Sequence, residues 1–173
     1  MIINYFKNII SYNLRKFKSK KISYSQTGID LILNSIFRDV NKGFYIDVGC
    51  NHPIYNNNTY LLYKKGWSGI NIDLDDECIK LFNLFRRDDI NINAALSSSV
   101  GTKNYFFFHN KSPINTLDKI TSQSHNTKVS EVKQINTNTL DNIINNTNYK
   151  QTNIDLLCID VEGHEIDVLN GFN

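Results

Sequence analysis

Short apolar runs that end on an acidic residue or a glycine alternate with helical segments along this chain, and that alternation limits its fold more than any other feature. The clearest runs are residues 44–49, Ser68–Asp73 and residues 154–161. Each has the length and the β-branched or aromatic content of a buried strand. Strands separated by helices are typical of βαβ units, whose parallel strands form one sheet with helices on both faces. The sequence therefore predicts an α/β fold with a doubly wound parallel sheet.

Weaker patterns predict the remaining elements. Helices are expected over residues 23–37, 58–65, 75–87, 139–146 and 165–169, and further strands over 89–96 and 103–109. Ser25 or Thr27 is the expected N-cap of the first helix. Residues 110–138 are polar with little periodicity, so we expect a long loop there with one short strand at 132–137.

Charge separates a short leader from the rest of the chain. Residues 1–21 carry six Lys or Arg and no acid, so in a chain of net charge +2 the remainder has a net charge of −4. Apolar residues recur at steps of three and four over residues 2–17, which predicts an amphipathic helix with a basic polar side. We divide the chain into this leader, 1–22, and one domain, 23–173. We favour packing of the leader on its own domain or on a second copy of the chain. The alternative is contact with an anionic membrane surface.

Composition excludes several classes of protein. The acidic body carries no run of alternating basic and aromatic residues, which argues against a nucleic-acid partner. No apolar stretch approaches the length of a membrane span. Cys50, Cys78 and Cys158 form neither a disulfide framework nor a zinc-ligand spacing. We interpret them as small buried hydrophobes in a protein of the reducing cytoplasm.

The ends of the first two strands have the layout of a nucleotide site. Asp47 and Gly49 end the first strand, with Asn51 in the loop that follows, and Asp73 ends the second. Gly49 permits a tight turn, and Asp73 can accept hydrogen bonds from both ribose hydroxyls. A carboxylate at Asp47 would repel a pyrophosphate but attract the ammonium of a methionine group, and the loop lacks G-x-G-x-x-G. This favours S-adenosylmethionine over NAD, while a purely structural role for Asp47, as the cap of a turn, stays open.

Two further strand ends carry candidate site residues. Asn93 and Ala94 follow the third strand, where a flat adenine ring would find space and a polar partner. Asp160, Glu162 and His164 follow the last strand. They can hold a metal or deprotonate a hydroxyl, or the carboxylates cap the next helix and His164 lies at the surface.

Taken together, these motifs resemble those of the FkbM-type S-adenosylmethionine-dependent methyltransferases. The segments that carry the resemblance are SQTGID at 25–30, YIDVGCNHP at 45–53, NTYLLYKKGWSGINID at 58–73, NAALS at 93–97 and IDVEGHE at 159–165. It extends from about residue 23 to the last residue. The resemblance implies a class I, Rossmann-like methyltransferase that uses S-adenosylmethionine to O-methylate a sugar or a related small-molecule hydroxyl, often for polysaccharide or secondary-metabolite biosynthesis.

The resemblance also implies roles for the residues at the strand ends. Asp47 and Gly49, with Asn51 beside them, would approach the methionine end of the cofactor, and Asp73 would hold the ribose. Asn93 and Ala94 would flank the adenine. The catalytic residues Asp160, Glu162 and His164 would face the acceptor, with Asp160 or His164 as the base and His52 as a less favoured one. No residue is assigned to a metal.

Other functions remain open at this stage. A nicotinamide-linked oxidoreductase would use the same fold. A catalytically inactive member of the family would act as a binding module that depends on a partner. Because the family fold continues beyond the turn at 160–163, we expect a sheet truncated after its fourth core strand, with residues 154–160 as an exposed apolar edge. A partner chain would complete that sheet. We expect a cytoplasmic protein, peripheral to the inner membrane face if the leader binds lipid.

Overall fold

The computed structural model describes Lys7, Ile10 and residues 23–173. The amphipathic helix expected over residues 2–17 therefore lies outside the described residues, except for Lys7 and Ile10, which are helical and exposed. No helix in the described part of the chain is long and apolar enough to cross a membrane.

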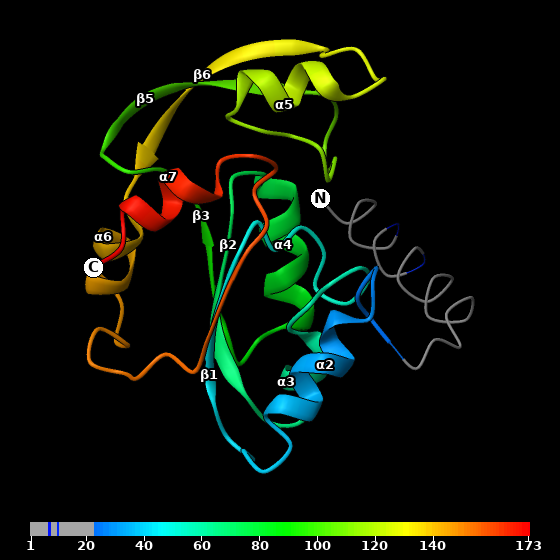
Figure 1. Cartoon of the computed structure of the whole chain (residues 1–173), viewed down its shortest axis with the longest axis vertical. Coiled ribbons are helices and arrows are strands. Elements are labelled where there is room, and N and C mark those ends of the chain that lie inside the picture. Colours follow the sequence, from blue (N-terminus) through cyan, green and yellow to red (C-terminus); the bar gives the residue numbers. More distant parts are fainter. Residues whose placement is uncertain (1–6, 8–9, 11–22) are drawn as a thin grey trace.

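Four parallel strands form the main sheet, in the order β3-β2-β1-β7. The strands are β1 (Phe44–Val48), β2 (Ser68–Asp73), β3 (Ile90–Asn93) and β7 (Leu156–Ile159). Helices α2 (Ile29–Ile36), α3 (Tyr60–Lys64) and α4 (Asp76–Phe85) lie on one side, and α6 (Leu140–Asn145) and α7 (Glu165–Asn170) lie on the other (Figure 1). The structure thus confirms an α/β fold with a mostly parallel sheet.

A second, smaller sheet lies across one end of the first (Figure 1). It contains β4 (Ala95–Leu96), β5 (Gly101–Phe107) and β6 (Glu131–Asn138), in the order β4-β6-β5. The single strand expected over 89–96 is wrong, because the chain leaves the main sheet after Asn93 and joins this one. Within the loop expected over 110–138, β6 confirms the short strand expected at 132–137 and extends it by one residue at each end, whereas helix α5 (Lys119–Ser124) was not expected.

The start of α2 differs from the expected one. Its N-cap residue is Gly28, at φ 81°, rather than Ser25 or Thr27, although the Ser25 hydroxyl accepts from the first-turn N–H of Asp30 at 3.4 Å. The Ser23 and Ser25 hydroxyls donate to the carboxylate of Asp30, at 2.6 and 3.0 Å. The fully buried Asp30 carboxylate thus holds Ser23 and Ser25 against the start of α2.

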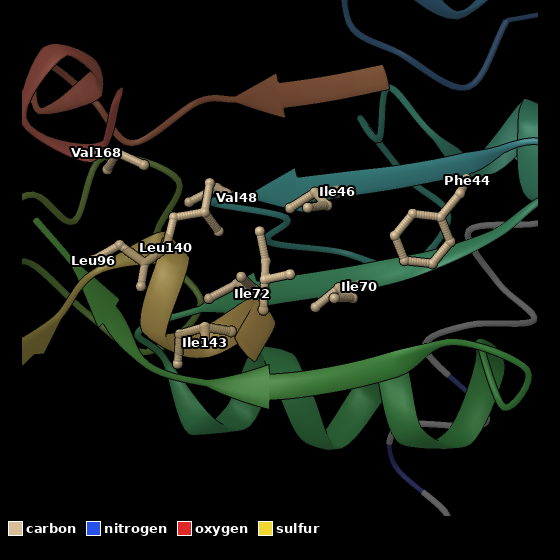
Figure 2. Close-up of a cluster of buried hydrophobic side chains, with 10 residues drawn as sticks. Phe44, Ile46, Val48, Ile70, Ile72, Leu96, Leu140, Ile143 and Val168 are labelled. Atoms are coloured by element: carbon tan, nitrogen blue, oxygen red, sulfur yellow. The ribbon is translucent and has the colours of Figure 1, made fainter. Parts of the chain in front are cut away.

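One face of the main sheet packs only aliphatic and aromatic side chains. Phe44, Ile46 and Val48 of β1 point to this face because alternate residues of a strand share one side. Figure 2 shows them beside Ile70 and Ile72 of β2, facing side chains of α6 and α7. Because all four strands are parallel, their carboxyl ends lie at the same edge of the sheet.

The opposite face buries polar groups around Arg86, which has no exposed surface. The guanidinium donates to the Tyr45 hydroxyl at 3.0 Å and lies 3.8 Å from the Asp89 carboxylate. It also donates to the Pro53 carbonyl, Asn57 and Thr59, at 3.0, 2.8 and 2.9 Å. Buried charges need such partners, since each has given up its water.

Strand β7 lies at the edge of the main sheet. Among the described residues it pairs with β1 alone, and its four residues are half-buried. The truncation expected from the sequence, and the partner chain along this edge, stay predictions.

Candidate active site

The carboxyl ends of β1, β2 and β7 surround a narrow cavity of about 50 Å³. Its lining includes seven of the residues singled out in the sequence: Gly49, Asn51, Asp73, Ala94, Asp160, Glu162 and His164. A larger hollow of about 530 Å³ adjoins it, and Gly49, Asn51, Asp160 and Glu162 line both. The larger volume falls in the usual range for small-molecule sites.

Gly49 closes the tight turn at the end of β1. Its φ of 76° lies in the left-handed region, and a Cβ at this position would overlap the backbone carbonyl oxygen of Asp160. The Gly49 N–H donates to the Ile72 carbonyl at 2.9 Å. Only glycine fits here, and it lets the turns after β1 and β7 come together at the cavity.

Asp73, at the end of β2, is held by backbone groups. One carboxylate oxygen accepts from the Asn51 N–H and the other from the Asp75 N–H, each at 2.8 Å. Burial raises the pKa of this carboxyl to about 6, although those two N–H bonds pull it downwards. Each oxygen keeps a further lone pair, so the ionised group can accept hydrogen bonds from a pair of ligand hydroxyls.

Asp47 does not line the cavity. It accepts from the Thr59 hydroxyl at 2.7 Å and from the Asn57 side-chain amide at 3.2 Å, and it is 3% exposed. Burial raises the pKa of its carboxyl above the ordinary value. Both partners of Asp47 belong to the polar face of the sheet, so the structure agrees with a structural role for it, and its approach to a methionine group stays a prediction.

Asn93 and Ala94, expected as a pair, separate at the end of β3. Ala94 lines the narrow cavity, and its N–H donates to the Asp73 carbonyl at 3.0 Å. Asn93 is exposed, and its side-chain amide donates to the same carbonyl. Of the two, only Ala94 is placed to meet a ligand in the cavity.

The turn after β7 carries Asp160 and Glu162 to the mouth of the cavity. Glu165 fixes this turn, since its carboxylate accepts from the N–H groups of Val161 and Gly163, both at 3.1 Å. Glu162 has a φ of 55°, a left-handed conformation that is unfavourable for a non-glycine residue. Burial, and then the nearby Asp160, raise the pKa of the Glu162 carboxyl.

A family model described as the methyltransferase FkbM domain matches residues 47–173. The match spans every strand end that surrounds the cavity. This chain belongs to the FkbM methyltransferase family. Comparisons with curated proteins and with solved structures find no match. The family resemblance predicted from the sequence is thereby confirmed.

His164 is a buried residue of this methyltransferase, so its alternative placement at the surface is wrong. One ring nitrogen lies 3.1 Å from the Ser97 hydroxyl and the other 3.5 Å from the Asp167 carboxylate. Burial lowers the pKa of the imidazole below its usual range. Because both nitrogens already have partners, His164 is better suited to holding α7 against β4 than to accepting a proton from a ligand.

His52, the less favoured base, faces the larger hollow. Its Nδ1 accepts from the backbone N–H groups of Ile54 and Tyr55, at 3.1 and 2.9 Å. The neutral ring therefore carries its proton on Nε2. Because Nδ1 of His52 already accepts from the backbone, this arrangement disfavours Nδ1 as the base.

A metal does not fit the last-strand cluster. In the described part of the chain, no group of three or more His, Cys, Asp or Glu side chains is arranged to hold a metal ion. Asp160 and Glu162 lie near each other, but His164 bonds to Ser97 and Asp167 instead.

The segment between β5 and α5 contributes residues that the sequence did not reveal. Ser112, Pro113, Asn115 and Leu117 line the narrow cavity. The Thr116 hydroxyl donates to the Glu162 carbonyl at 2.6 Å and so ties this segment to the turn after β7. The polar composition of residues 110–138 hid this role, and Pro113 was its only local signal.

The cysteines agree with their interpretation as packing residues in two of three cases. Cys50 and Cys78 are buried, whereas Cys158 is half-buried, and all three are free thiols. Burial raises the pKa of the Cys50 thiol well above its usual value. A protonated buried thiol is inert, so none of the site's chemistry is assigned to it.

Proposed function

We propose that this FkbM family member uses S-adenosylmethionine to methylate a hydroxyl group of a sugar or a related small molecule. The observation that carries the proposal is the Asp73 carboxylate. It ends β2, it is oriented by two backbone N–H groups, and it lines the cavity beside the glycine turn of β1. An acid in this position is suited to the two hydroxyls of a ribose.

The residues around Asp73 fit the rest of the cofactor in chemical terms. Gly49 and Asn51 bring backbone close to the cavity, where a methionine group would find polar partners. Ala94 leaves space for a flat ring. The narrow cavity alone is too small for such a ligand. Asp73 and Ala94 line that cavity, and the adjoining hollow of about 530 Å³ shares Gly49 and Asn51 with it, so we assign the ligand to the two spaces together.

A carboxylate is the proposed base. When bound, the cofactor supplies an electrophilic methyl group on a sulfonium. A sugar hydroxyl is barely acidic, so it needs a proton acceptor as its oxygen becomes nucleophilic. Asp160 and Glu162 both face the larger hollow, and burial raises the pKa of each carboxyl, which suits a proton acceptor. We place Glu162 first, because strained backbone at a cavity is typical of a functional residue.

Titration calorimetry with S-adenosylmethionine tests the cofactor, with NAD as the competing ligand. Asp73→Asn is expected to weaken S-adenosylmethionine binding at least about tenfold, because charge-assisted hydrogen bonds to the ribose are lost. Asp76→Asn is the matched control, since Asp76 is an exposed acid on α4 that pairs with Lys80. Equal affinity for the Asp73→Asn variant and the wild type would sink the cofactor assignment, and NAD binding would favour the oxidoreductase.

Methyl transfer is tested with cofactor labelled in its methyl group and an extract of surface glycans. Label in the glycan fraction, lost in Glu162→Gln, is the expected result. Binding of cofactor without transfer to any acceptor would instead favour the inactive binding module.

The cellular setting is also a proposal. Contact of residues 1–21 with an anionic membrane at the inner face of the cytoplasm rests on the charge of the leader. A partner chain along β7 rests on the pairing of β7 with β1 alone within the described residues. An active monomer would contradict the partner chain along β7. Protein that stays in the supernatant when vesicles rich in phosphatidylglycerol are sedimented would contradict the membrane contact of residues 1–21.

A further inference from the structure

His125 lies directly after α5, and its side chain points to Glu162. Its Nε2 is 4.0 Å from a carboxylate oxygen of Glu162. That nitrogen is closed off from solvent and has no hydrogen-bond partner within the described part of the chain. A buried nitrogen that has given up water without gaining a partner is costly, and native structures rarely retain one without a reason.

Neighbouring residues hold the His125 ring and the Glu162 backbone in place, whereas the Glu162 side chain can move. The Phe108 ring packs edge-on against the imidazole, with 5.7 Å between centroids. The Thr116 hydroxyl holds the Glu162 carbonyl, and a Cβ at Gly163 would overlap the Thr121 hydroxyl of α5. The Glu162 carboxylate is the adjustable part, and a movement of about 1 Å closes the gap to hydrogen-bond distance.

Two other acids lie near Glu162 and make a hydrogen-bond donor to its carboxylate more important. Asp160 and Glu165 both face Glu162 and repel its charged form. Glu165 is already bonded to the backbone of the turn, whereas Nε2 of His125 lies 4.0 Å from the Glu162 carboxylate and has no other hydrogen-bond partner among the described residues. A carboxylate in this position needs one fixed hydrogen bond if it is to keep one orientation.

We propose that His125 is a positioning residue of the methyltransferase site: its Nε2–H donates to one oxygen of Glu162 and directs the other oxygen into the cavity. The inference rests on the proposed function only for the role of Glu162 as base. The imidazole–carboxylate pair itself stands on the geometry of α5 and the turn after β7.

Nuclear magnetic resonance of the imidazole nitrogens tests the pair without any acceptor. The Nε2 signal of His125 is expected to move in Glu162→Gln, while that of His164 stays in place. Asp167→Asn is the matched control, because Asp167 lies 3.5 Å from the His164 ring, and it should move His164 alone. A His125 signal that ignores Glu162→Gln would overturn the pair.

Activity variants test the positioning role. His125→Leu is expected to lower methyl transfer from labelled S-adenosylmethionine about tenfold or more, since a misdirected base is a poor one. His125→Gln retains an N–H donor and should recover part of that loss. Affinity for S-adenosylmethionine should stay within about twofold in both variants, since His125 does not line either cavity.

Each result has a distinct meaning. Equal transfer in the wild type and His125→Leu overturns the positioning role, as does a loss that His125→Gln fails to recover. If wild-type protein does not bind S-adenosylmethionine, the proposed function fails, while the imidazole signals still decide whether the pair exists.

Discussion

The two faces of the main sheet differ in chemistry, although the same strands supply both. One face buries a cluster of aliphatic and aromatic side chains, with Phe44, Ile46 and Val48 of β1 fully or almost fully buried. The other packs Tyr45 against Leu62 and Trp67, and it also buries a polar network of Tyr45, Asp47 and Arg86. Apolar contacts are non-directional, so the first face stabilises the sheet without specifying the shape of any loop. The hydrogen bonds of the second face are directional, and several of them are made to the loop after β1, which lines the site.

The connection to the site runs through the loop after β1. Arg86 donates to the Pro53 carbonyl and to the Asn57 side chain, at 3.0 and 2.8 Å. Asn57 in turn donates to the Cys50 carbonyl at 3.2 Å, next to Gly49 of the cavity. The polar face is therefore expected to control both stability and ligand binding. On the apolar face, Val48 and Ile72 line the cavity whereas Ile46 does not, so Ile46 is expected to affect stability alone.

Arg86→Met gives the largest expected loss on the polar face. It removes the cationic partner of the buried Asp89 and the donor to the Pro53 carbonyl and the Asn57 side chain, which costs about 3–5 kcal/mol of unfolding free energy. Urea denaturation measures that cost, and calorimetry should find S-adenosylmethionine binding weakened in the fraction that folds. Arg87→Met, at the exposed neighbouring position, is the control and should stay within about 0.5 kcal/mol. Equal stability of the two variants would refute the proposed importance of the polar face.

Ile46→Ala tests the apolar face. Removing this fully buried side chain leaves a cavity and is expected to cost about 2–5 kcal/mol. Cofactor affinity of the folded protein should be unchanged, because Ile46 lines neither the narrow cavity nor the larger hollow. Ile46→Val, expected to cost about 0.5–1.5 kcal/mol, provides the graded control. Weaker cofactor binding in either folded variant would remove the distinction between the faces.

The same contrast explains which parts of the fold could be predicted. Apolar runs such as Ser68–Asp73 are local patterns, and β2 has those bounds. The polar partners of Asp47, namely Asn57 and Thr59, are set by tertiary packing, so the sequence suggested a ligand contact instead. The same limit hid α5 and His125, which lie in a polar segment without periodicity.

Within the site, the sequence could indicate placement where backbone geometry decides it. Gly49, Asp73 and Glu162 lie at or after the carboxyl ends of parallel strands, which meet at one edge, and all three line the cavity. His164 lines it too, but its partner Ser97 follows β4, which no local pattern indicated, and the acceptor-facing role of His164 stays a prediction.

The pH dependence of stability should separate Asp73 from an ordinary surface acid. Burial raises the pKa of Asp73 from its usual 3.8 to about 6, so the group favours the folded state below pH 4. That contribution is lost as pH rises through 6, and it amounts to at most about 3 kcal/mol. The unfolding free energy of the wild type relative to Asp73→Asn should therefore fall between pH 4 and about 7.

Asp118 supplies the control of opposite sign. The Thr121 N–H holds the pKa of the Asp118 carboxyl below its usual value, so its contribution is present at neutral pH and lost as pH falls. Wild type relative to Asp118→Asn should show a slope opposite to that of Asp73. Parallel slopes for the two pairs would contradict the burial of Asp73 at the cavity.

The smallest expected effect concerns the strained residue where the turn after β7 meets the cavity. Glu162→Gly and Glu162→Ala both remove the carboxylate, and both should abolish methyl transfer. They differ only in backbone preference, and at a φ of 55° glycine is the more stable by about 1 kcal/mol. Thermal unfolding of the two variants measures the difference. A more stable alanine variant would mean that the backbone of Glu162 is not strained. A more stable glycine variant would mean that the protein keeps a carboxylate at this position at a cost to its stability, whereas the side chains of the apolar face stabilise the fold.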